Sequence, residues 1–68
     1  MNIDDFLSKQ DEVFLKKCFD ELEDFRKTGV LIDGEVRKLN ATFFKSNVST
    51  LFSIGELIYR EIAKRHFN

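Results

Sequence analysis

The stretch that decides the fold is DEVFLKKCFDELEDFRKTG, residues 11–29. Leu15, Cys18, Leu22 and Phe25 follow one another at steps of three and four, which places them on one face of an α-helix. The opposite face is charged, and its opposite charges are four residues apart: Glu12–Lys16, Lys17–Glu21 and Glu23–Lys27. Gly29 suits the left-handed residue that commonly ends a helix. The pattern predicts an amphipathic helix over residues 9–27.

The start of this helix is marked less clearly than its end. Ser8-Lys9-Gln10-Asp11 resembles a capping box, in which the serine oxygen accepts a hydrogen bond from a free helix amide. Three apolar residues precede it: Ile3, Phe6 and Leu7. They form either an additional N-terminal turn or an extension of the same helix.

Residues 30–46 allow two interpretations. Asp33-Gly34 between apolar residues is typical of a type I′ hairpin turn. Val36, Leu39 and Phe43 instead repeat at helical spacing. We favour a second helix over residues 35–46, with Asp33 as its N-cap.

A third helix is expected over residues 50–66, beginning near either Ser49 or Ser53. Ser53 and Glu56 have the spacing of a capping box, flanked by Phe52 and Leu57 as a hydrophobic staple. Apolar residues occur on two sides of this helix, with Val48, Leu51, Ile58 and Ile62 on one and Ile54 and Leu57 on another. Such a helix needs more than one neighbour. The fold class is therefore all-α, a small three-helix bundle in one domain, residues 1–68.

The size of the chain suggests that it associates. A chain of 68 residues buries only about 60% of the surface that its unfolded form exposes. Its one cysteine excludes an internal disulfide, and its one histidine argues against a structural zinc site. We therefore expect no metal or other cofactor, and a homodimer formed through the third helix.

The expected location is the cytoplasm. No apolar run approaches the roughly 20 residues of a membrane span, so we expect no membrane contact. The stretch Met1-Asn2-Ile3-Asp4-Asp5 lacks the basic and then apolar layout of a signal peptide. A lone thiol suits a reducing compartment. The usage of Lys, Phe, Ile and Asn suits a small bacterial, phage or plasmid protein.

No combination of side chains predicts an enzyme. His66 lies in a basic last turn with no specified acid partner, and Cys18 lies on the apolar face of its helix. A nucleophilic cysteine needs an electropositive and partly exposed setting. The three glycines form no phosphate-binding pattern.

The leading interpretation is a protein–protein interaction module, such as an adaptor, an inhibitor or a regulatory protein. Phe43 and Phe44 are adjacent, so they are not expected to face the same core, and one of them should meet a second surface. The same reasoning applies to apolar residues on more than one side of the third helix. The candidate interface consists of Phe44, Ile54, Leu57, Ile58, Tyr59 and Ile62.

The alternative is a nucleic-acid-binding regulator of the helix-turn-helix type. Residues 1–24 carry a net charge of −5 and residues 25–68 one of +4. The candidate anion contacts are Arg37, Lys38, Lys45, Arg60, Lys64 and Arg65. Against this, the total charge is −1, and the start of the third helix is apolar where base contacts usually arise.

Overall fold

The secondary structure is helical throughout the described part of the chain. The computed structural model describes residues 2–67, in which there is no strand. The elements are α1 (Ile3–Ser8), α2 (Glu12–Thr28), α3 (Glu35–Phe44), the short 3-10 helix η1 (Val48–Thr50) and α4 (Leu51–Phe67). The all-α prediction is confirmed, and the hairpin alternative is wrong. The expected domain, residues 1–68, extends one residue beyond the described range at each end.

Helix α2 ends where the sequence predicts but begins later. Gly29 has a φ of 75°, and its N–H donates to the carbonyl oxygen of Phe25 at 2.8 Å. The N-cap is Asp11, whose carboxylate accepts from the N–H of Phe14 at 2.8 Å. Ser8 was the expected cap, but its hydroxyl donates to the carbonyl oxygen of Asp5, within the preceding helix.

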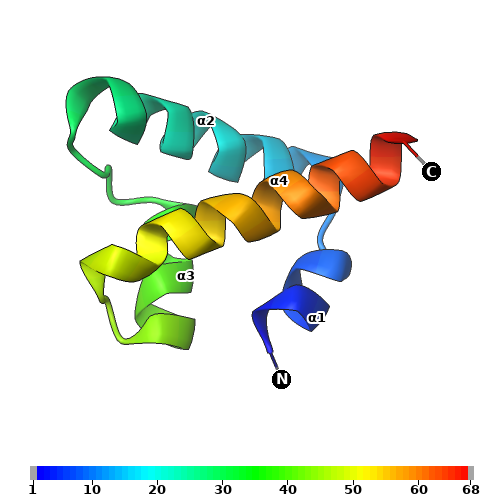
Figure 1. Cartoon of the computed structure of the whole chain (residues 1–68), viewed down its shortest axis with the longest axis horizontal. Helices are drawn as coiled ribbons and strands as arrows, with labels where there is room; N and C mark the ends of the chain where they lie inside the picture. The colour runs from blue at the N-terminus through cyan, green and yellow to red at the C-terminus, as the bar shows by residue number, and fades with distance from the viewer. Residues whose placement is uncertain (1, 68) are drawn as a thin grey trace.

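The N-terminal apolar residues form a helix of their own. In α1, Asn2 is the N-cap and accepts from the N–H of Asp5 at 2.9 Å. Ile3 and Leu7 are buried, and α1 packs against α4 (Figure 1). The additional N-terminal turn, one of the two expected alternatives, is therefore present as a short helix, and residues 2–67 contain four α-helices.

The N-terminus of helix α3 is capped by a side chain of another helix, α2. Asp33 is not its N-cap; that position is Gly34, which has no side chain to accept a hydrogen bond. Glu21 of α2, 4% exposed, accepts instead from the N–H groups of Glu35 at 3.2 Å and Val36 at 2.9 Å. A Cβ atom on Gly34 would lie only 2.6 Å from Oε2 of Glu21. The glycine at this position thus makes room for the capping carboxylate.

The link from α3 to α4 turns sharply. Lys45 and Ser46 both adopt the left-handed region, with φ of 55° and 62°. Asn47 then caps η1 by accepting from the N–H of Ser49 at 3.0 Å. Helix α4 follows directly at Leu51, midway between the two expected starts, and Ser53 lies inside the helix.

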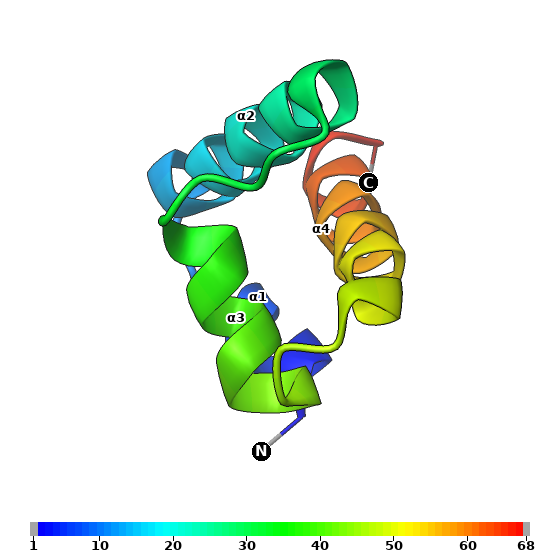
Figure 2. The ribbon, with the colours of Figure 1, turned by 90° about the vertical axis from the view of Figure 1, so that its left-hand side faces the viewer.

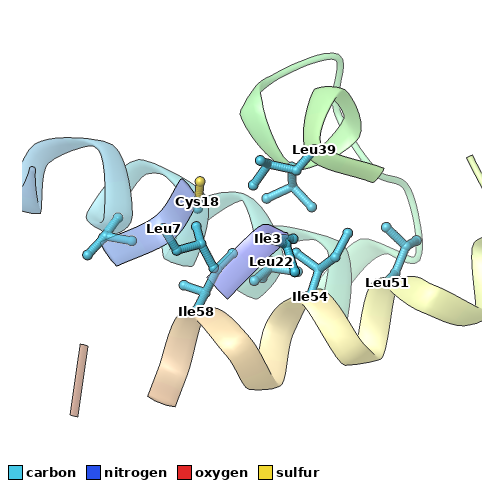
Figure 3. Close-up of a cluster of buried hydrophobic side chains, with 10 residues drawn as sticks. Ile3, Leu7, Cys18, Leu22, Leu39, Leu51, Ile54 and Ile58 are labelled. Atoms are coloured by element: carbon cyan, nitrogen blue, oxygen red, sulfur yellow. The ribbon is translucent and has the colours of Figure 1, made fainter. Parts of the chain in front are cut away.

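The buried cluster takes side chains from all four α-helices. Helix α2 packs against both α3 and α4, and α3 packs against α4, so that the helices surround a common interior (Figure 2). The cluster consists of Ile3, Leu7, Leu15, Cys18, Leu22, Val36, Leu39, Leu51, Ile54 and Ile58. Figure 3 shows the last three projecting from α4 toward α2 and α3. The radius of gyration, 11.3 Å, is close to the roughly 11 Å expected for a compact chain of this length.

Candidate protein-binding surface

An apolar groove lies between the C-terminal half of α2 and the N-terminal half of α4. Its volume is 230 Å³, and it is lined by Leu22, Phe25, Arg26, Leu51, Phe52, Gly55, Glu56 and Tyr59. Phe52 is 72% exposed, whereas Leu51 beside it is 5% exposed and belongs to the core. The groove therefore places an uncovered aromatic ring beside an apolar hollow.

Gly55 contributes to the hollow because it has no side chain. A Cβ atom at this position would lie 3.8 Å from Cδ1 of Leu22, which is an ordinary van der Waals contact. Neither its backbone conformation nor a close neighbour requires glycine here. Glycine in a helix costs about 1 kcal/mol relative to alanine. Its presence leaves the groove open at a cost in helix stability.

Tyr59 forms one wall of the groove and is held in place. Its hydroxyl donates to Oε1 of Glu23 at 3.1 Å. Its ring packs edge-on against that of Phe19, with 5.3 Å between the ring centroids. Burial raises the pKa of Tyr59, and the hydrogen bond to Glu23 raises it further. Arg26 lies 3.6 Å from the same carboxylate. These contacts hold the side chain of Tyr59 in place within the chain itself.

Two of the six predicted interface residues belong to the core. Ile54 and Ile58 are 0% exposed, so neither can contact another molecule while the chain is folded this way. Both side chains project from α4 toward α2 and α3, so helices of the same chain cover them (Figure 3).

The other four predicted interface residues are partly buried. Phe44, Leu57 and Ile62 pack against the core cluster, and Phe43 does so as well. Adjacent phenylalanines on α3 therefore both contact the interior, contrary to the expectation. Of the predicted set, Tyr59 alone lines the groove.

Sequence reasoning missed Phe52, Gly55 and Phe25 as surface components. Phe52 was interpreted as a staple and Phe25 as core, whereas Phe25 is only partly buried. The sequence feature that could have indicated this surface is an aromatic residue, Phe52, three positions before a glycine, Gly55, within one helix. That spacing places a ring beside an open patch on the same face.

Most of the predicted anion-binding side chains are engaged within the chain. The Nζ atom of Lys38 lies 3.6 Å from Oε1 of Glu35, and that of Lys64 lies 3.9 Å from Oε1 of Glu61. Arg37 donates a hydrogen bond to the carbonyl oxygen of Leu31. Across residues 2–67, Lys45 and Arg60 make no ion pair, and they lie on separate elements. Together with Arg65, which pairs with Glu61, four of the six predicted side chains therefore contact groups of their own chain.

Arg65 has a structural role. Its Nη2 donates to the carbonyl oxygens of Leu7 and Ser8 at 3.2 Å each and of Gln10 at 2.6 Å. Its Nε donates to Oε2 of Glu61 at 2.9 Å. A cation at the C-terminal end of a helix satisfies free carbonyls and complements the helix dipole. Arg65 thus fastens α1 to α4.

Cys18 and His66 are the two side chains that the sequence analysis considered for catalysis or metal binding. Cys18 is 0% exposed, and burial together with the nearby Glu21 and Glu35 raises its pKa to about 12. His66 is exposed, with Nε2 3.7 Å from Oε1 of Glu12. Within residues 2–67, no three His, Cys, Asp or Glu side chains converge as a metal site would need. No helix in this range has the length and apolar character to cross a membrane.

The chain was also compared with known proteins, and no protein family, curated protein or solved structure matches it.

Proposed function

We propose that this chain is a non-enzymatic protein–protein interaction module, with an adaptor, inhibitory or regulatory role, that acts through the groove between α2 and α4. The observation that supports this is the 72% exposure of Phe52 beside an apolar hollow. Exposed apolar patches on small proteins commonly mark association surfaces. Aromatic side chains seated in pockets provide much of the binding energy at such surfaces.

The proposal includes a cytoplasmic location, because the buried thiol of Cys18 requires no oxidising compartment. Nucleic-acid binding has less support. Arg37, Lys38, Lys64 and Arg65 already have partners within the chain.

Affinity capture from the native host, followed by mass spectrometry, tests the function. The bait is compared with Phe52→Asp and with Phe67→Asp. Phe67 is also exposed, at 86%, but lies at the far end of α4. We expect a specific partner protein to be lost with Phe52→Asp and retained with Phe67→Asp. Equal recovery with both variants would contradict binding through the groove.

A further inference from the structure

We infer that the groove is occupied by a second copy of this chain, in a two-fold dimer in which Phe52 of each copy enters the groove of the other. This inference rests on the proposed function and names the partner. It differs from the dimer expected from sequence, because the contact is made by Phe52 and the groove and not by Ile54 and Ile58.

The first argument is shape. The surface carries a projection, the exposed ring of Phe52, and directly beside it the hollow left by Gly55 over Leu22. A two-fold contact uses the same patch on both chains, so the patch must be complementary to itself. A projection beside a hollow meets that condition. Each groove then receives the ring that the other copy exposes.

The second argument is charge. Arg26, whose Nη1 lies 3.6 Å from Oε1 of Glu23, stands on the α2 side of the groove, and Glu56 stands on the α4 side. A two-fold axis along the groove brings the α2 side of one copy over the α4 side of the other. Arg26 then faces Glu56 of the second copy, twice in the dimer. Among residues 2–67, Glu56 has no cationic partner within its own chain.

The third argument is area. A stable interface buries about 800 Å² on each partner. The chain exposes 4725 Å² and measures 32 × 27 Å across its broad face, to which α2 and α4 both belong (Figure 1). This face is therefore broad enough to hold a contact of that size, which would cover apolar surface that a chain of this size benefits from burying.

Sedimentation velocity over a concentration series tests the dimer. We expect the mass to rise from 8.0 kDa toward twice that value as the concentration increases through the micromolar range. Phe52→Asp should raise the dissociation constant about 30-fold or more, the effect of removing a binding hot spot. Phe67→Asp is the matched control and should leave the constant unchanged. Wild-type protein that remains a monomer at several hundred micromolar overturns the inference, whereas the capture experiment tests the proposed function separately.

Charge reversal tests the arrangement within the dimer. Arg26→Glu and Glu56→Arg should each weaken association, because like charges then face one another twice. An equimolar mixture of the two variants should associate again, because both contacts in the mixed dimer join opposite charges. Circular dichroism checks that each variant is folded. If the mixture associates no better than the separate variants, the proposed two-fold arrangement is wrong.

Discussion

Helix α4 has apolar residues on its inner side and an apolar residue, Phe52, at the groove, but only those on the inner side are covered. Ile58 is 0% exposed on the inner side, and Phe52 is 72% exposed less than two turns away. Both residues belong to the hydrophobic pattern that predicts the helix. The difference between them depends on the neighbouring helices. A hydrophobic pattern therefore identifies which residues are apolar, but it does not show which of them remain available to a partner.

Polar contacts show the same contrast. On the inner side, Glu21 satisfies two N–H groups of α3, and within the described residues no buried side-chain polar atom lacks a hydrogen bond. At the outer groove, Glu56 has no ion-pair partner among those residues. The buried polar groups on the inner side are thus all hydrogen-bonded within the chain, whereas the carboxylate of Glu56 at the groove remains able to form an ion pair.

The largest expected effect on stability comes from introducing an aspartate on the inner side of α4, and it is compared with an aspartate at the groove. Ile58→Asp should unfold the chain, because an unpaired carboxylate in the core costs more than about 4 kcal/mol. Phe52→Asp should change the free energy of unfolding of the monomer by only about 0.5 kcal/mol. Urea denaturation at low protein concentration measures both. Equal destabilisation would show that Phe52 is as structural as Ile58.

A smaller loss is expected where α2 caps α3. Gly34→Ala should destabilise the fold by about 2 kcal/mol, because the added methyl group displaces the carboxylate of Glu21. Glu21→Ala should cost about the same, since it leaves the same N–H groups unpaired. The double variant should cost much less than the sum of the two, because both substitutions break one contact. Additive losses in urea denaturation would show that the two residues act independently.

The buried thiol makes stability depend on pH. The pKa of Cys18 is raised from 9.0 to about 12 in the folded chain, so between these values the unfolded chain loses the thiol proton first. The unfolded state then binds fewer protons, and stability falls as pH rises, by at most about 1.4 kcal/mol per pH unit. Below pH 9 this contribution is fully present. Urea denaturation should show the wild-type chain losing more stability than Cys18→Ala between pH 9 and 11; parallel profiles would contradict this.

The smallest effect concerns the groove itself. Gly55→Ala should stabilise the monomer by about 0.5–1 kcal/mol, because the methyl group fits beside Leu22 and alanine favours the helix. The same methyl group occupies part of the hollow, so association should weaken while the chain becomes more stable. Thermal unfolding and sedimentation measure the two effects. If Gly55→Ala strengthens association, the hollow is not the binding site.

The sequence predicted best where structure depends on nearby residues. Helix α2 was placed correctly at its end because Gly29 and the preceding basic residues are local signals. The start of α3 at Glu35 was predicted correctly, but its cap was not, because the capping residue Glu21 lies 14 positions from the amide of Glu35. No local pattern reveals such a contact. The sequence also could not show that α1 is a separate helix that packs against α4.

The candidate site was predicted only in part for the same reason. Of the predicted interface residues, Tyr59 lines the groove, whereas Ile54 and Ile58 are buried in the core. The hydrophobic pattern of α4 does not show how α2 and α3 are arranged around it, and these two helices cover both isoleucines (Figure 3).

The attachment of α1 also affects the order in which the chain opens. Arg65 joins carbonyl oxygens 55 to 58 residues away in sequence. Because closing a long loop costs more entropy than closing a short one, α1 should dock last during folding and detach first in the native state. Hydrogen exchange would then show α1 as a separate opening unit, with its amides less protected than those in the middle of α2 and α4. Each opening would briefly expose the inner side of α4, so Arg65 helps to determine how often the core meets water.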